Sequence, residues 1–195
     1  IFLEEAYFSN SSEVYFKGLL DISELYENLW RFNQSKKYHN MAYDSYVDLL
    51  KEEFCRTSEN GRQMYWEKSK FYVDITLNIA EHYTRFHPLN YTNPFAGDAM
   101  NVLLLSKGIL LNTTKSFENF VYESRNKQAI DILNHKKQIE QTPENSQILD
   151  SLDFLILEVL RDNGQNFELP QLSIGWKDIQ KEMGDEDLLL EFYKH

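Results

Sequence analysis

The sequence is poor in residues that interrupt helices and in residues that cross-link a chain. Its 195 residues include 7 glycines, 4 prolines and a single cysteine, Cys55. The few glycines and prolines favour long helices over many tight turns. One cysteine excludes a disulfide framework within the chain. This leaves the redox compartment open but favours a reducing one, and we expect a cytoplasmic location.

Long apolar runs are also lacking. The longest, such as Leu103 to Leu105, is broken by Ser106 and Lys107, so it is too short to span a bilayer. We therefore expect no membrane partner. The chain begins with Ile1 and stops soon after a predicted strand, and we expect both ends to be cuts through a longer protein.

Positive charge is scarce and scattered. Twenty Lys and Arg stand against 31 Asp and Glu, a formal net charge of -11. Such an excess repels polyanions, and binding of phosphates needs clustered cations, so no nucleic-acid partner is expected. The two dense pairs, Lys36-Lys37 and Lys136-Lys137, are predicted to lie on solvated helix faces.

What the sequence has in quantity is material for a core: 42% of the residues are hydrophobic and 14% aromatic. This is enough for one substantial domain or a run of helical repeats. The hydrophobic spacing predicts a mainly α fold of antiparallel helical hairpins of tetratricopeptide-like or α-solenoid type. The fold is predicted to end in a short helix and a single β-strand.

The first hairpin is predicted over residues 14–50, with a turn at 31–33 and helix continuing to residue 56. Tyr26 and Ala42 occupy the positions where a tetratricopeptide repeat packs an aromatic against a small residue, with Leu29 and Tyr46 as apolar partners. Trp30 stands where that repeat has a small residue. A plain helical hairpin explains the same pattern.

Further helices follow. Residues 62–85 are predicted as one helix, apolar on most of its circumference and central in the core. Gly108 in the helix that starts near Ala96 suggests close approach of a neighbouring helix. Helix is predicted again over residues 116–122 and 127–141.

The next helix should start at Thr142-Pro143-Glu144, with a hydroxyl cap and proline at its first position. It should end at Asn163-Gly164. Its apolar positions are expected to line one face: Ile148, Leu152, Leu155 and Val159, widened by Leu149, Ile156 and Leu160.

The last segment changes character. Residues 166–173 are predicted to be extended. Trp176, Ile179 and Met183 mark a short amphipathic helix, and alternating residues over 188–193 predict a buried strand.

These C-terminal motifs resemble a known family. The stretch IGWKDIQK (174–181) followed by DEDLLLEF (185–192) is similar to the opening of a CHAT domain, a caspase-like cysteine peptidase often fused behind tetratricopeptide repeats in bacterial proteins. NVLLLSKGILLNTT (101–114) resembles the helix that precedes such domains, and Tyr65-Trp66-Glu67 resembles the close of the repeat array. The resemblance covers residues 62–195.

The resemblance implies three segments. Residues 1–61 would be a degenerate tetratricopeptide-like hairpin, 62–164 a long-helix bundle linking repeats to peptidase, and 165–195 the truncated start of the CHAT domain. The family's catalytic His and Cys follow strands beyond the first, and no residue here matches them. The chain would then be a noncatalytic scaffold or regulatory segment that binds a protein partner or its own C-terminal peptidase domain.

Two alternatives stay open. The chain could be a self-standing helical interaction module whose C-terminal strand pairs with a partner or a second copy. It could also be a small enzyme that uses Cys55 as nucleophile, with His39 or His82 as the nearest base along the chain. Cys55 lies beside Phe54 on a predicted helix, a setting typical of a buried structural cysteine.

No catalytic, cofactor-binding or metal-ligating residue is predicted. His39, His82, His87 and His135 show no ligand spacing and are expected at the surface or at helix caps. The acidic run at 182–187 lacks the ligand order of a calcium loop and is interpreted as a solvated turn. The aromatics near the N-terminus are either core exposed by truncation or a ligand groove: Tyr7, Phe8, Tyr15, Phe16, Trp30 and Phe32.

Overall fold

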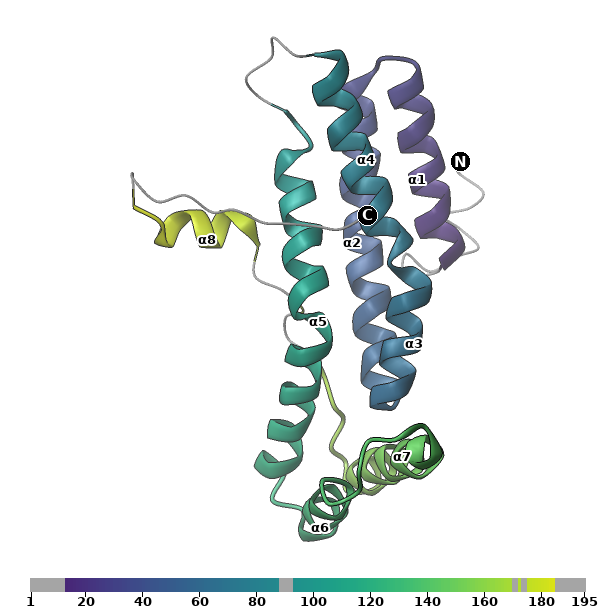
Figure 1. The fold of residues 1–195 in the computed structure, drawn as a ribbon, viewed down its shortest axis with the longest axis vertical. Helices are drawn as coiled ribbons and strands as arrows, with labels where there is room; N and C mark the ends of the chain where they lie inside the picture. The colour runs from purple at the N-terminus through teal and green to yellow at the C-terminus, as the bar shows by residue number, and fades with distance from the viewer. Residues whose placement is uncertain (1–12, 88–92, 170–171, 173–174, 185–195) are drawn as a thin grey trace. The chain divides into compact units, whose positions relative to one another are not determined.

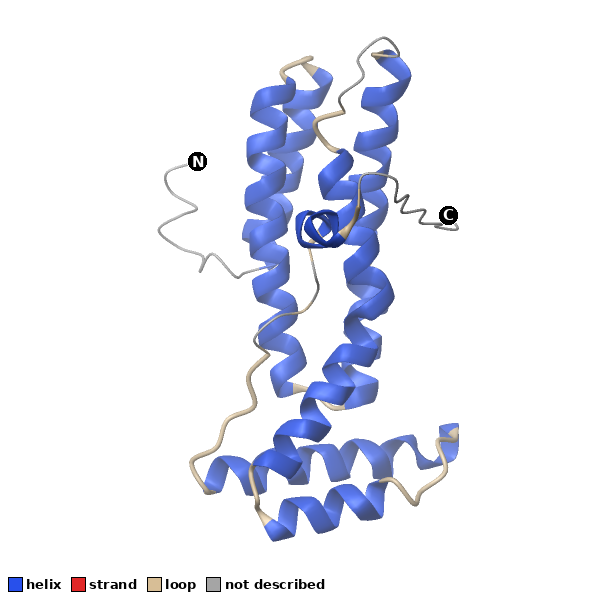
Figure 2. Ribbon diagram, turned by 90° about the vertical axis from the view of Figure 1, so that its left-hand side faces the viewer, coloured by secondary structure: helices blue, strands red, loops and turns tan. Residues whose placement is uncertain are grey.

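The computed structural model describes residues 13–87, 93–169, 172 and 175–184, and all regular structure within them is helical (Figure 2). The helices are α1 (Glu13–Asn28), α2 (Phe32–Arg56), α3 (Glu59–Ser69), α4 (Phe71–Phe86), α5 (Ala96–Glu123), α6 (Lys127–Lys136), the 3-10 turn η1 (Pro143–Asn145), α7 (Ser146–Asp162) and α8 (Trp176–Glu182). The predicted mainly α class is confirmed, as is the short helix at Trp176. The predicted strand at 188–193 lies outside the described residues.

The chain forms two compact units, each assembled from separate segments. Unit 1 comprises Ile1–Leu50, Phe71–Leu104 and Ile174–His195, and unit 2 comprises Lys51–Lys70 and Leu105–Ser173. Helices α2 and α5 contribute to both units. The division expected from the sequence, at residues 61 and 164, concerns family modules and stays a prediction.

Unit 1 is built on the predicted α1–α2 hairpin, with α4 beside it (Figure 1). The hydroxyl of Ser23 on α1 donates to the carbonyl of Ser35 on α2 at 3.0 Å, and both side chains are buried. The centre of the unit is Tyr72 of α4, fully buried between Phe16 of α1 (5.4 Å between ring centroids) and Tyr46 of α2 (4.6 Å). Aromatic packing thus joins three helices.

The hairpin differs in detail from the prediction. Ala42 and Tyr46 are buried as expected, but Tyr26 stacks on Tyr38 at 5.5 Å and Leu29 is 54% exposed, so its predicted apolar role is wrong. The turn is also earlier than predicted, because α2 begins at Phe32. A helical hairpin is present, and its membership of the tetratricopeptide type stays a prediction.

The predicted single helix over 62–85 is wrong, since α3 and α4 are separate helices that meet at Lys70. Neither glycine nor proline marks the break. At the break, the Trp66 carbonyl accepts both the Lys70 N–H and the Ser69 hydroxyl. Trp66 is the buried hydrophobic residue of α3, whereas Met64 is 67% exposed, so the predicted all-round apolar helix is not found in α3.

Helix α5 runs without interruption from Ala96 to Glu123, so the separate helix predicted at 116–122 is part of it. The proposed reason for Gly108 is also wrong. A Cβ at Gly108 would meet only the side chain of Asn112 on the same helix. Gly97, in the first turn of α5, has the tightest surroundings of the described glycines, because a Cβ there would overlap the indole ring of Trp176.

In unit 2, α6 and α7 pack side by side (Figure 1). Asn126 caps α6 by accepting the Ala129 N–H at 3.1 Å, and α6 ends at Lys136 rather than at 141. Pro143 opens η1 as predicted, but no Thr142 side-chain cap bond forms, and α7 proper starts at Ser146.

The end of α7 at Asn163-Gly164 is confirmed, with Gly164 at a φ of +74°. Its buried face is not quite the predicted one: Ile156, Val159 and Leu160 are buried, but Ile148 and Leu155 are exposed. Asp153 lies on the buried face instead and is only 1% exposed.

Candidate functional site

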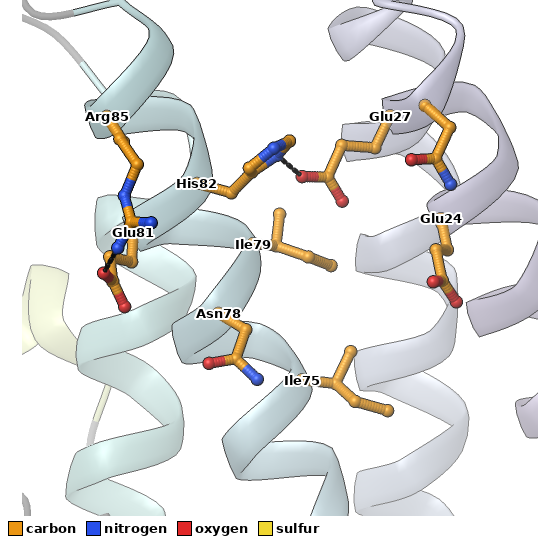
Figure 3. A pocket seen from close by; sticks show the side chains of 9 residues that line it. Glu24, Glu27, Ile75, Asn78, Ile79, Glu81, His82 and Arg85 are labelled. Carbon is orange, nitrogen blue, oxygen red and sulfur yellow. Dashed lines mark hydrogen bonds and ion pairs between the residues drawn. The ribbon is translucent and has the colours of Figure 1, made fainter.

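A pocket of about 400 Å³ lies in unit 1 between α1 and α4 (Figure 3). Glu24, Glu27 and Asn28 reach it from α1. The α4 residues that line it are Ile75, Asn78, Ile79, Glu81, His82 and Arg85. Residues spaced by three, four and seven positions on α4 share one face, which is why this set gathers there. The pocket has a partly apolar floor and a rim that carries more carboxylates than cations.

The side chains of Glu27 and His82 form the most defined contact of this pocket. His82 Nδ1 lies 2.5 Å from Glu27 Oε1, and the Glu27 side chain is 9% exposed against 44% for His82. Glu81 pairs with Arg85 at 2.5 Å on the exposed side, leaving the exposed Glu24 as a further negative charge. A rim of this composition favours a cationic group with an apolar stem, such as a Lys or Arg side chain.

The His82–Glu27 pair continues into an exposed aromatic edge. The ring of His82 packs on Phe86 at 4.6 Å, and Phe86 packs edge-on to Trp30 at 5.7 Å. Trp30 is 58% exposed, Phe86 51% and the adjacent Leu29 54%. We call Leu29, Trp30, Phe86 and the pocket residues together the Trp30 surface.

Trp30 also has an unfavourable backbone. It sits at a φ of +58°, where the Trp30 N–H donates to the Glu27 carbonyl and the Arg31 N–H donates to the Tyr26 carbonyl. This is the left-handed helix end that glycine serves best, and Gly164 makes the same pair of bonds after α7. A side chain in this conformation costs about 1 kcal/mol. Folding stability therefore does not account for an exposed tryptophan here.

Unit 2 contains a buried ionic cluster that the sequence analysis missed. Lys136 Nζ lies 2.7 Å from Asp153 Oδ1 and 3.1 Å from Glu59 Oε2, and the Lys136 side chain is 11% exposed. The Glu59 N–H, in the first turn of α3, donates to Asp153 Oδ2 at 2.8 Å. The cluster ties α3, α6 and α7 together. The prediction of a solvated Lys136 is wrong, because the carboxylates of α3 and α7 cover it.

Arg62 is buried next to that cluster. Its Nε donates to the Thr57 carbonyl at 3.2 Å, and its guanidinium lies 5.0 Å from the ring centre of Phe117. Burial lowers the pKa of Arg62, while the charges of Asp153 and Glu59 act against that shift. These contacts describe a cluster of opposite charges that packs α3, α6 and α7 together.

His39 is a third polar group inside the protein, within unit 1. It is fully buried, and its Nε2 lies 3.2 Å from Thr76 Oγ1 and 3.4 Å from the Tyr72 hydroxyl. Burial, with a smaller effect of the charge on Lys36, lowers the pKa of His39 to about 4. The predicted surface position of His39 is wrong, and so is that of Lys36, which is partly buried and paired with Asp98.

The other predicted candidates are scattered. His87 stacks on Tyr83 at 4.5 Å, and His135 is exposed in the last turn of α6. Burial raises the pKa of the half-buried Cys55 thiol, although the backbone of Leu169 and the charge of Arg62 act the other way. That environment opposes thiolate formation. Among the described residues, no group of three or more His, Cys, Asp or Glu is arranged to hold a metal ion.

Of the predicted aromatic set, Phe16 belongs to the core of unit 1, Tyr15 and Phe32 are half-buried and Trp30 is exposed, while Tyr7 and Phe8 lie outside the described residues. The acidic run at 182–187 is described only through Gly184.

The short helix α8 is held to α5 within unit 1. The Trp176 N–H donates to Asn101 Oδ1 at 2.9 Å, and the indole ring occupies the space that a side chain at Gly97 would need. Gly97 and Asn101 are four residues apart and so face the same way on α5. These two residues form the seat of Trp176.

Comparison of the chain with family models, with curated proteins and with solved structures found no match to any of them. In the described part of the chain, none of the helices has the length and apolarity needed to cross a bilayer. The functional argument therefore rests on the residues and contacts above.

Proposed function

We propose that the chain is a noncatalytic helical scaffold that binds a protein partner and regulates a CHAT peptidase domain following it in a longer protein. One observation carries this proposal: α8, the tryptophan helix of the CHAT-like motif, is seated on Gly97 and Asn101 of α5. Residues 101–114, the other motif that resembles the family, belong to the same helix. The two motifs are thus in mechanical contact, as a regulatory connection requires.

The contact gives the proposed regulation a physical form. A side chain at Gly97 cannot coexist with the indole of Trp176 in its seat, so the position of α8 depends on α5. A partner that shifts α5 would change how strongly α8 binds to Gly97 and Asn101. The position of α8 would in turn change the position of the start of the following domain. This is a coupling through one packed element with two positions, docked and released.

Gly97→Val tests the coupling. We expect it to release α8 and to speed amide hydrogen exchange over residues 175–184 about tenfold or more, while the rest of unit 1 stays protected. Gly108→Ala is the matched control on the same helix, because its added methyl meets only Asn112. It should leave exchange in α8 unchanged.

The functional half of the test uses the longer protein in a cysteine-peptidase assay on a mixed peptide library. Gly97→Val should change the rate of hydrolysis at least about fivefold, and Gly108→Ala should not. Equal rates in the native protein and Gly97→Val, with α8 released, would refute regulation through α8.

The alternative, a self-standing interaction module without a peptidase, is favoured by the Trp30 surface. An exposed, strained tryptophan beside an acidic pocket serves recognition whether or not a peptidase follows. The two candidates share the interaction role and differ in whether the longer protein cleaves peptides.

A further inference from the structure

We infer that the Trp30 surface binds a basic, amphipathic peptide segment of a partner protein, with an apolar side chain against Trp30 and Phe86 and a Lys or Arg side chain in the pocket beside Glu27. This inference rests on the interaction role proposed above and does not depend on the peptidase.

Trp30 indicates that the partner also makes an apolar contact. The ring makes edge contacts with Phe86 and Phe32 but is still 58% exposed, and its backbone is in the left-handed region. The left-handed backbone costs stability, and the exposed part of the ring adds none. Large aromatic side chains beside less critical contacts are the residues that most often dominate binding at protein interfaces.

The charges around the pocket indicate that the partner's side chain there is basic. Glu24, Glu27 and Glu81 supply three carboxylates, against the guanidinium of Arg85, which is paired with Glu81, and the imidazole of His82, which contacts Glu27. Ile75 and Ile79 form an apolar floor (Figure 3), which suits the methylene stem of a Lys or Arg. The pocket volume of about 400 Å³ is within the range of ligand-sized sites.

Charge also argues against the other occupants. The chain has a net charge of -11, so a second copy would bring its own excess of acid to an acidic rim. The two terminal segments outside the described residues also carry more acidic than basic residues: IFLEEAYFSNSS (1–12) and DEDLLLEFYKH (185–195). Membrane lipid head groups and nucleic acids present phosphates, which the same rim repels.

A random 12-residue peptide library displayed on phage is the probe. Selection on the native chain should enrich sequences that carry Lys or Arg together with aromatic or long aliphatic residues. A selected peptide, made synthetically, should bind more weakly as salt is raised from about 0.05 to 0.5 M, because the pocket contact is electrostatic.

Two variants test the Trp30 contact and the acidic pocket separately. Trp30→Gly should weaken that peptide about thirtyfold, as loss of an interface hot spot does, while the melting temperature stays unchanged or rises. The double variant Glu24→Lys/Glu81→Lys changes only exposed side chains, so it should fold normally and remove the preference for basic peptides. Arg125→Gly, at the other described non-glycine residue with a positive φ, and Glu52→Gln, at a half-buried acid of α2 paired with Arg56, should bind as the native chain does.

Several results would overturn the inference. Selected peptides with no excess of basic residues would refute the chemistry of the pocket. Binding that survives Trp30→Gly, or that Glu52→Gln weakens equally, would place the site elsewhere. A dimer in sedimentation that Trp30→Gly dissociates would assign the surface to a second copy. None of these results bears on the peptidase assay, so the proposed regulation would stand or fall separately.

Discussion

Replacing Asp153 by alanine should destabilise the protein by about 3 kcal/mol or more. Asp153 is the closest carboxylate to Lys136 Nζ, at 2.7 Å, and both side chains are buried. Removing one partner of a buried ion pair typically costs 3–5 kcal/mol, and here Lys136 keeps only the 40% exposed Glu59, at 3.1 Å, as a counter-charge. Loss of the Asp153 bond to the Glu59 N–H adds to the effect, because a donor in the first turn of α3 loses its acceptor, although Ser58 still caps the helix. Urea unfolding followed by circular dichroism measures it as a lower midpoint.

The double variant Lys136→Met/Asp153→Leu is the matched comparison. It removes both charges and keeps the volume apolar, and such replacements are often neutral or stabilising. We expect it to recover part of the lost stability, since the remaining Glu59 is 40% exposed and can be hydrated, whereas the Glu59 N–H and the buried Arg62 still lack Asp153. A single variant that costs under about 1 kcal/mol, or a double variant as unstable as Asp153→Ala, would contradict a closely coupled buried pair.

Lowering the pH from about 6.5 to 4 should remove about 3 kcal/mol of stability through His39 alone. The pKa of this residue falls from an ordinary 6.5 to about 4 in the fold, and each unit corresponds to about 1.4 kcal/mol. The folded-state pKa is the lower one, so the unfolded chain takes up the proton first. The stabilisation is therefore fully present above pH 6.5 and is lost as the pH falls towards 4.

The groups around His39 determine which control variant the pH experiment needs. Thr76 and Tyr72 of α4 contact the ring by their hydroxyls, Phe95 packs edge-on, and the nearby charges are Lys36 and its partner Asp98. Burial raises the pKa of Asp98, so its protonation acts in the opposite direction. His39→Gln keeps a polar side chain that does not titrate.

Unfolding free energies at pH 7 and pH 4.5 should therefore differ by about 2–3 kcal/mol more in the native chain than in His39→Gln. The comparison cancels Asp98 and the other carboxylates. Equal pH dependence in the two proteins would show that His39 is not buried in its neutral form.

Local sequence signals predicted the elements better than the contacts between them. The stop at Asn163-Gly164 and the short helix at Trp176 follow from turn chemistry and spacing, and both are present. The break at Lys70 has no glycine or proline to announce it. Nothing in the local sequence distinguishes Gly97 from Gly108, because the difference is an indole ring some 80 residues away in the chain.

The buried charges were the feature least predictable from the sequence. Lys136 and Lys137 are an ordinary exposed pair by sequence, and only the fold brings Asp153 and Glu59 to the first of them. One signal was available: Asp153 lies four residues after Leu149 and three before Ile156, on the apolar stripe of α7. An acid at that position indicates a buried partner. The sequence named Trp30 as a departure from the repeat pattern and as one of several aromatics in a possible ligand groove, whereas its strain and exposure need the structure.

We have proposed that this chain is a noncatalytic segment of a cysteine peptidase. The most direct measurement compares the chain with the longer protein, through its native stop codon, in hydrolysis of a mixed peptide library. We expect cleavage only by the longer protein, abolished by a thiol alkylator, and none by this chain with or without Cys55→Ala. Cleavage by this chain alone that Cys55→Ala removes would contradict the claim. So would a longer protein with no further domain, which would leave the interaction module in its place.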